Sequence, residues 1–373
     1  MQSPDRELKV IHFVWIVAFL CISPLFGVLY LDSHLTPYLE FPPTTKYIIH
    51  APFSLQVFLL LILFVAAVCL PFLYRLITYK ADQRITIKGI YPFPSWGRLG
   101  IAVVAIFWVL AWNRYAFFQP LQRYTFFPLW AGYLLVINGL TCMRKGTCLL
   151  RSNPRFFLVL FPASALFWWY FEYLNRFVQN WYYLGGENIS AAEYIIHASI
   201  CFSTVLPAVV STHEYLRTLP RLATAFADWH PIPITGKKGI GRLLLAGTVL
   251  SLAALAVFPD YLFPLVWISP LLVIVGIQFA TGQPTFFDDV QKGNWQPVVL
   301  PALAALICGF FWEMWNWKSL AHWEYSVPFV HRFQIFAMPL PGYAGYLPFG
   351  LECVAAVSLI NEQFGKMDNG KTI

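Results

Sequence analysis

Glu172, Glu313 and Glu352 lie inside long apolar runs of this chain, and the first two share a pattern. Glu172 is followed three residues later by Asn175, and Glu313 is followed three residues later by Asn316. Residues at i and i+3 lie on the same face of a helix, so each carboxyl is expected beside an amide. Glu352 lies about midway along the run "YLPFGLECVAAVSL". These five residues are the candidate catalytic residues.

The chemistry expected of these groups follows from their surroundings. An ionisable side chain inside an apolar span is costly and usually faces the interior of a bundle with a partner. A carboxyl removed from water with no cation near it in the sequence, such as Glu352, suits a general acid, a proton carrier or a cation ligand. The two Glu-x-x-Asn pairs suit a pseudo-symmetric pair of polar sites at the outer mouth of a cavity.

A structural interpretation stays open for each of these groups. A protonated Glu352 could bond a backbone carbonyl, and the Glu-x-x-Asn pairs could hydrogen-bond neighbouring helices or cap the backbone of loops. Four tryptophans fall in the sixteen residues of "FFWEMWNWKSLAHWEY", which surround Glu313 and Asn316. Rings at such a density are typical of the aromatic belt at a membrane interface.

The apolar runs that carry these residues predict membrane-spanning helices. The chain is 58% hydrophobic and 12% charged, which is about half the charge of a typical soluble domain. Continuous apolar runs of about 18 residues or more are typical of spanning helices. The ten predicted spans are 10–31, 53–74, 99–112, 126–143, 156–174, 191–211, 243–258, 261–281, 298–317 and 343–360. The predicted fold class is therefore all-α, a polytopic transmembrane helical bundle.

The basic residues predict an orientation for this bundle. If the N-terminus is cytoplasmic, the inside segments are 1–9, 75–98, 143–155, 214–242, 282–297 and 362–373. These segments hold 19 of the 25 Lys and Arg residues, as the positive-inside rule requires. Both termini are therefore expected in the cytoplasm. The net charge of +7 reflects this orientation and anionic lipid head groups, so no nucleic-acid partner is expected.

Matching segments recur along the chain in the same order. "GRLG" resembles "GRLL" further on, and "FWWYFEYLNRFVQNWYY" aligns with "GFFWEMWNWKSLAHWEY", which pairs Glu172 with Glu313. Ordered similarity of this kind predicts an internal repeat. We expect two tandem parallel four-helix repeats, at 97–214 and 241–361, preceded by an N-terminal two-helix unit at 1–80.

No motif predicts a cofactor or a metal. The sequence contains no HExxH, no GxxxxGK[ST] and no GxGxxG, which are the patterns that would indicate a metalloprotease, a nucleotide phosphate or a dinucleotide. Its seven cysteines form no CxxC pair. The neighbouring Asp288 and Asp289 are interpreted as a solvated turn. No soluble domain is expected, so the sequence argues against ATP-driven transport by this chain alone.

One region resembles a known group of proteins. The run "CGFFWEMWNWKSLAHWEYSVPF", continuing to "MPLPGYAGYLPFGLE", is similar to one in an uncharacterised family of bacterial multi-pass integral membrane proteins. The resemblance implies a bacterial cytoplasmic (inner) membrane and brings no activity. Members of that family often carry Glu before the Met-Pro-Leu, where this chain has Ala337, which counts against an essential carboxylate there.

A second, shorter resemblance concerns an enzyme family. The segment "WYYLGGENISAAEYI" is similar to a pattern in the small membrane-bound carotenoid cyclases. Those enzymes protonate an isoprenoid with carboxylates and shelter the carbocation in an apolar pocket. The second half of the chain keeps Trp323-x-Tyr325 but lacks the acidic residue that opens the next span.

Three function classes remain open from the sequence. The first is a membrane-embedded enzyme that acts on a lipid or isoprenoid, with Glu352 or Glu313 as the acid and Asn316 orienting it. The second is a secondary transporter or channel in which Glu352 couples protons. The third is a scaffold or assembly subunit. The many rings, the short loops and the single mid-span carboxyl favour the enzyme, whereas the parallel repeat favours the transporter. Membrane lipids are the expected partners, with an apolar lipid or isoprenoid as the candidate ligand.

Overall fold

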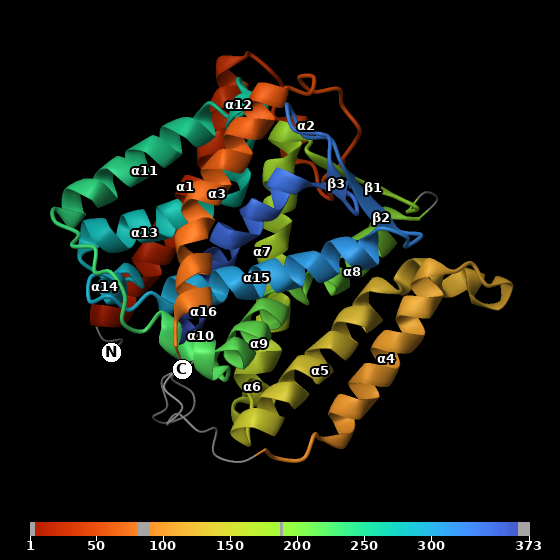
Figure 1. Cartoon of the computed structure of the whole chain (residues 1–373). Helices are drawn as coiled ribbons and strands as arrows, with labels where there is room; N and C mark the ends of the chain where they lie inside the picture. Colours follow the sequence, from red (N-terminus) through yellow and green to blue (C-terminus); the bar gives the residue numbers. More distant parts are fainter. Residues whose placement is uncertain (1–3, 81–89, 187–188, 365–373) are drawn as a thin grey trace.

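Helices make up most of the chain. The computed structural model describes residues 4–80, 90–186 and 189–364 (Figure 1). Eight helical segments in these ranges are long and apolar enough to cross a membrane, which confirms an all-α multi-pass membrane protein. They are Ile11–Tyr30 of α1, Leu55–Thr78 (α3), Ser95–Trp112 (α4), Phe126–Lys145 (α5), Pro154–Val178 (α7), Ala191–Arg217 (α8 and α9), Gln296–Asn316 (α15) and Leu340–Asn361 (η3 and most of α16).

Ten spans were expected, and the difference lies in one region of the second half. Helix α11 (Lys237–Ala253) ends before the predicted span 243–258 is complete. The predicted span 261–281 is broken into Pro259–Trp267 and Ser269–Thr281, which meet at an angle of 62° and make a ninth span if counted as one. Pro264 and Pro270 start the second and third helical pieces of this region. Proline cannot donate the backbone hydrogen bond that would continue a helix, so an apolar run alone overstates the span.

The remaining elements are short and connect the long helices. Five helices differ in their bounds from the spanning segments or form only part of one. They are α1 Pro4–Tyr30, α8 Ala191–Phe202, α9 Val205–Arg217, α13 Ser269–Thr281 and α16 Tyr346–Phe364. The short helices are α2 Thr36–Leu39, α6 Leu149–Ser152, α10 Pro220–Ala225, α12 Pro259–Leu262 and α14 Phe287–Val290, with 3₁₀ turns η1 Ala116–Tyr124, η2 Phe263–Trp267 and η3 Leu340–Gly345. The strands are β1 Trp181–Leu184, β2 His322–Tyr325, β3 Gln334–Ile335 and β4 Met338–Pro339.

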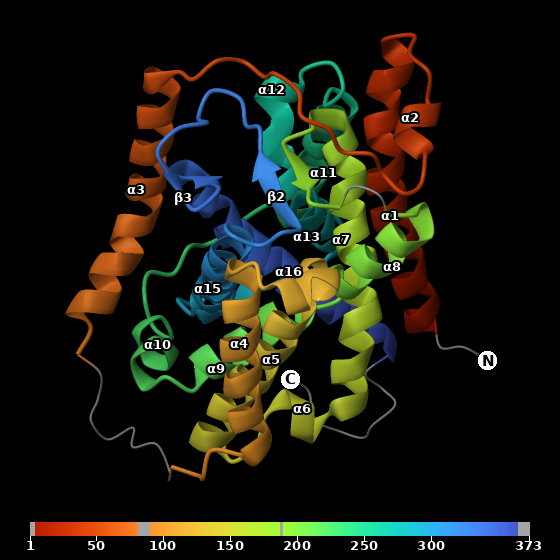
Figure 2. The same ribbon diagram turned by 90° about the vertical axis from the view of Figure 1, so that its right-hand side faces the viewer.

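The long helices surround a central group formed by α7, α9, α15 and α16. Helix α4 packs along α5, α11 packs along α13, and α15 packs against α16 and α9. Figure 2 shows α3 and α1 on opposite sides of the molecule. Helix α1 packs on α11 and α13, whereas α3 contacts η3 and α10. Of α3, only Phe58 is buried, so most of its apolar surface is left to lipid. The division into units at 1–80, 97–214 and 241–361 remains a prediction.

Two small sheets join loops of the chain. Strand β1 pairs antiparallel with β2, with Trp181 opposite Tyr325 and Tyr183 opposite Trp323. Strand β3 pairs with β4. No strand was expected from the sequence. The aromatic residues of β1 and β2 have high strand propensity, but each strand is four residues long and its partner lies in the other half of the chain.

Close helix crossings depend on glycine. A Cβ atom on Gly241 would lie 2.5 Å from the backbone nitrogen of Ala280 and 2.7 Å from the carbonyl oxygen of Gly276. Both distances are shorter than atoms tolerate, and backbone cannot move aside as a side chain can. Gly241 therefore allows α11 to approach α13, as small residues commonly do between membrane helices. At Gly247 of the same helix, a Cβ atom would meet no neighbour within 4 Å.

Gly241→Ala is expected to lower the stability of the bundle, because the added methyl group forces α11 away from α13. Overpacking of this kind costs about 1–3 kcal/mol. Gly247→Ala is the matched control and should leave stability unchanged or slightly higher, because alanine favours helix. Thermal unfolding in detergent, followed by tryptophan fluorescence, measures both variants. Equal melting temperatures for the two would contradict the close crossing.

Candidate functional site

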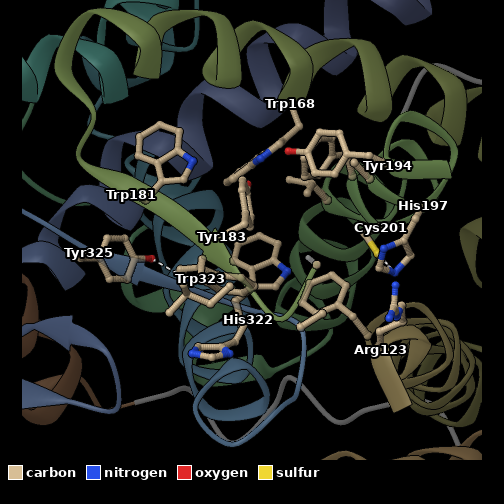
Figure 3. Close-up of a pocket in the computed structure, with 18 of the residues that line it drawn as sticks. Arg123, Trp168, Trp181, Tyr183, Tyr194, His197, Cys201, His322, Trp323 and Tyr325 are labelled. Atoms are coloured by element: carbon tan, nitrogen blue, oxygen red, sulfur yellow. Dashed lines mark hydrogen bonds between the residues drawn. The ribbon is translucent and has the colours of Figure 1, made fainter. Parts of the chain in front are cut away.

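An aromatic cavity lies between α7, α8, the end of α15, the start of α5 and the β1–β2 sheet (Figure 3). It holds about 1060 Å³ of space between atoms, including the open volume at its mouth. Its wall contains five indole rings, from Trp168, Trp181, Trp267, Trp312 and Trp323. A largely apolar wall with a few polar groups is typical of sites for small apolar ligands.

The Glu172 carboxylate stands behind this wall and binds the rings that form it. Its Oε1 atom accepts hydrogen bonds from the Tyr183 hydroxyl at 2.5 Å, the Trp168 indole at 3.0 Å and the Trp181 indole at 3.1 Å. All three donor rings line the cavity, whereas Glu172 does not. Glu172 is fully buried. Three donors at one oxygen stabilise its charged form, as a buried carboxylate requires.

The Glu313 carboxylate occupies a corresponding place behind the same wall. Its Oε1 atom accepts hydrogen bonds from the hydroxyls of Tyr325 at 2.7 Å and Tyr346 at 2.8 Å. The Trp323 indole donates to the Tyr325 oxygen at 2.9 Å, which extends the network by one ring. Within the described residues, the Oε2 atoms of Glu313 and Glu172 have no hydrogen-bond partner. Each carboxylate therefore keeps one oxygen that can accept another proton.

The β1–β2 sheet presents the phenols to the cavity. Side chains alternate between the two faces of a strand, so Trp181, Tyr183, Trp323 and Tyr325 share the face that lines the cavity. Tyr182 lies between two of these residues and points to the other face, where its hydroxyl donates to Glu324 at 2.6 Å. The pairing register thus places both cavity-facing phenols on one small surface, although they come from different parts of the chain.

Both cavity-facing phenols of the sheet are held in the protonated state. Burial raises the pKa of Tyr183 well above its usual range, and the neighbouring Glu172 raises it further. Burial likewise raises the pKa of Tyr325, with Glu313 adding to the effect. Because a raised pKa favours the neutral phenol, both hydroxyls keep their protons through the physiological pH range. They serve as proton donors to the carboxylates.

The two asparagines hold backbone rather than carboxylates. The Asn175 side chain donates to the Trp181 carbonyl at 2.8 Å and accepts from the Asn180 backbone N–H at 2.8 Å. The Asn316 side chain donates to the Trp323 carbonyl at 2.7 Å and accepts from the Trp323 N–H at 2.8 Å. Each amide closes the turn that leads from its helix into β1 or β2. Asn316 was expected to orient an acid, and its contacts instead fix the strand that carries Tyr325.

Glu352 lies apart from the cavity. It is fully buried on α16, and neither of its oxygens has a hydrogen-bond partner within the described residues. It is absent from the cavity wall. The structure thus brings together the surroundings of Glu172 and Glu313 in one wall and leaves Glu352 in the centre of the bundle.

The sequence does not single out several of the residues that line the cavity. Tyr183 and Tyr325 stand out there as the tyrosines of the cyclase-like W-x-Y pattern, with no catalytic role assigned to them, and Arg123 belongs to no motif. A signal exists for the tyrosines, because a W-x-Y follows each Glu-x-x-Asn at a similar distance. Arg123 is one of only six Lys and Arg residues in the segments predicted to lie outside. Basic residues are scarce there, and this scarcity is the one sequence feature that could have drawn attention to Arg123. Arg176, four residues after Glu172 on α7, donates to the carbonyls of Tyr38 and Glu40.

The comparisons with known proteins give no relative for this chain. No family model, no curated protein and no solved structure matches it. Over the described ranges, no three His, Cys, Asp or Glu side chains lie together in a way that could hold a metal ion. The fold and the site define a multi-pass membrane protein with an aromatic cavity backed by two buried carboxylates.

Asn316→Ala is expected to destabilise the protein by about 1–3 kcal/mol, because it leaves the Trp323 N–H and carbonyl without partners. Asn113→Ala is the matched control, since the Asn113 side chain is exposed and bonds only a carbonyl of its own helix. Thermal unfolding in detergent compares the two variants with the parent chain. A melting temperature for Asn316→Ala no lower than that of the control would mean that the amide does not hold β2.

Proposed function

We propose that this protein binds an apolar lipid or isoprenoid in the aromatic cavity and acts on it by proton transfer. Tyr183 and Tyr325 face the substrate, and Glu172 and Glu313 are their carboxylate partners. One observation carries the proposal: each fully buried carboxylate is hydrogen-bonded to phenols whose rings line the same cavity. Perturbed, paired titratable groups beside a cavity are typical of acid–base sites.

The chemistry follows from the hydrogen bonds. A proton that leaves the substrate is taken by a phenol oxygen while the phenol passes its own proton to the carboxylate Oε1. The reverse transfer, from a protonated carboxyl through a phenol, adds a proton to the substrate. Two such pairs can remove a proton at one position and add one at another, which leaves the substrate isomerised or cyclised with no net oxidation. General acid–base catalysis of this kind contributes a factor of about 10²–10⁴ to a rate.

The wall of the cavity suits such a reaction. Five indole rings and few polar groups exclude water and accept an apolar chain. The faces of aromatic rings also stabilise a positive charge, by about 0.5–2 kcal/mol for each favourable contact. Protonation of a carbon–carbon double bond creates such a charge, so an isoprenoid substrate fits the aromatic wall and the paired acids together.

A secondary transporter is the second candidate function, and Glu352 favours it. A fully buried carboxyl with no partner among the described residues, in the centre of a membrane bundle, is typical of groups that carry protons. The aromatic wall of the cavity favours the enzyme, because a path for ions or polar solutes needs polar lining. A purely structural role for the Glu-x-x-Asn pairs agrees with their contacts to backbone and rings. It does not account for the aromatic cavity beside them.

We also propose a bacterial inner-membrane location with both termini in the cytoplasm, and an internal repeat. Two short helices of the loops predicted inside, α6 and α10, lie toward one end of the molecule, and α2 and α12 lie toward the other (Figure 1). The repeat is supported by the matching contacts of the two Glu-x-x-Asn pairs. It is also supported by the β1–β2 register, in which each tryptophan faces the tyrosine of the other strand.

Tyr183→Phe is expected to abolish or strongly reduce the conversion of the lipid substrate, because it removes the hydroxyl that links the cavity to Glu172. Tyr182→Phe is the matched control: it removes a hydroxyl bonded to a carboxylate on the opposite face of the same strand. Lipid extracts of the native host carrying each variant, compared by mass spectrometry with a deletion strain, measure the conversion. Restoration of the parent lipid profile by Tyr183→Phe would contradict the proposal.

Glu172→Gln, Glu313→Gln and Glu352→Gln separate the candidate functions in the same assay. The first two variants are expected to resemble the deletion strain, because glutamine cannot take the phenol proton. A lipid profile that depends on Glu352 alone would favour a function coupled to protons in the bundle centre. Folding of every variant is checked by its elution and melting temperature in detergent.

A further inference from the structure

We infer that the ligand of this cavity is an amphiphile whose anionic phosphate head group binds Arg123 and whose apolar tail fills the aromatic end. The inference rests on the proposed function and names the chemical class of its ligand. It is drawn from the position, the surroundings and the unused hydrogen-bond donors of Arg123.

Arg123 is the single lysine or arginine among the described residues that line the cavity. It lies half-buried at the end of η1, next to Tyr124, and Figure 3 shows its guanidinium beside the His197 ring on one side of the cavity. Trp181 and Tyr325 lie on the opposite side. A cavity with a cation at one side and aromatic rings at the other is complementary to an amphiphile that has an anionic head group and an apolar tail.

The Arg123 guanidinium makes no hydrogen bond and no ion pair within the part of the chain that the structure describes. Among the other arginines of the predicted outer segments, Arg114 and Arg176 each donate to two backbone carbonyls. Arg332 lies over the Phe53 ring. A guanidinium carries five N–H donors in a planar fork. No Arg123 nitrogen is enclosed by the protein, so this fork is open to the cavity and can donate to a ligand there.

No carboxylate of the described residues forms an ion pair with this cation. Among the described residues, neither Asp nor Glu lines the cavity. The Glu193 carboxylate on α8 accepts a hydrogen bond from the Tyr124 hydroxyl at 2.5 Å and forms no ion pair with Arg123. His197 and His322 are the imidazole groups in the wall. Arg123 therefore makes the described lining positive, and a positive lining favours an anion.

The chemistry of the fork selects the head group. Guanidinium binds phosphate or carboxylate oxygens through two parallel hydrogen bonds. A phosphate carries more negative charge than a carboxylate, so it binds the cation more strongly. The five indole rings of the wall can offer a polar group only their N–H donors. Two of these, from Trp168 and Trp181, already donate to Glu172, so this end of the cavity suits an apolar tail. A prenyl phosphate and a membrane phospholipid share the required combination of phosphate and apolar tail, and the experiment separates them.

Binding to the purified full-length chain in detergent micelles tests the inference. The probes are geranylgeranyl monophosphate, geranylgeraniol, dioleoyl phosphatidic acid and inorganic phosphate, with tryptophan fluorescence as the readout. The prenyl phosphate is expected to bind at least tenfold more tightly than the alcohol of the same tail, and inorganic phosphate to bind too weakly to detect. Tighter binding of the phosphatidic acid would instead identify a phospholipid as the source of the head group.

Arg123→Gln is expected to weaken binding of the preferred phosphate lipid at least tenfold and to leave binding of geranylgeraniol unchanged. Arg123→Lys keeps the charge and should retain most of the affinity, which guards against misfolding of the glutamine variant. Arg332→Gln is the matched control, because Arg332 is exposed, lies over the Phe53 ring and does not line the cavity. It should bind all probes as the parent chain does.

The outcomes distinguish this inference from the function on which it rests. Equal affinity for the prenyl phosphate and the alcohol, or an equal loss in Arg332→Gln, overturns the role of Arg123 and leaves a neutral isoprenoid site intact. Failure of every lipid to bind overturns both. Inorganic phosphate that binds as tightly as the lipids shows that the tail is not recognised, which also overturns the inference.

Discussion

A carboxylate that is removed from water must be surrounded by hydrogen-bond donors, and this requirement organises the functional end of the molecule. Glu172 and Glu313 are both fully buried, and charge in such a place is tolerated only when donors replace the lost water. The donors are phenols and indoles of Tyr183, Tyr325 and their neighbours. The rings must therefore converge on the carboxylates, and the strands that carry them must pair.

The same rings form the wall of the cavity, so the structural and the functional requirement meet in one set of side chains. Asn175 and Asn316 fix the turns into β1 and β2 through backbone hydrogen bonds. The antiparallel register then presents two tryptophans and two tyrosines on one face. Stabilising the buried charge in this way leaves a rigid aromatic surface with protonated hydroxyls, which is what proton transfer to an apolar substrate needs.

Glu352 shows what happens without such donors. It lies in the bundle centre with neither oxygen bonded within the described residues, so no donor there replaces the water that a charge would lose. The contrast separates two kinds of buried acid in one chain: two that are held by cavity-lining rings, and one that stands without such contacts. The proposed acid–base role at the cavity and the alternative proton-carrying role in the bundle would therefore fall to different residues.

The sequence by itself determined that the chain lies in a membrane, that it is helical, and that each Glu-x-x-Asn pair shares one helix face. Hydropathy and helix periodicity are local properties, so a sequence reading captures them. It overcounted the spans at α11, which ends at Ala253, and in the predicted span 261–281, where Pro264 and Pro270 restart the helix because apolar length does not register a missing backbone donor. Only the tertiary structure decided the pairing of Trp181 with Tyr325 and the approach of Arg123 to His197. Those contacts join segments distant along the chain, and their geometry depends on how α7, α8 and α15 pack, which no local pattern encodes.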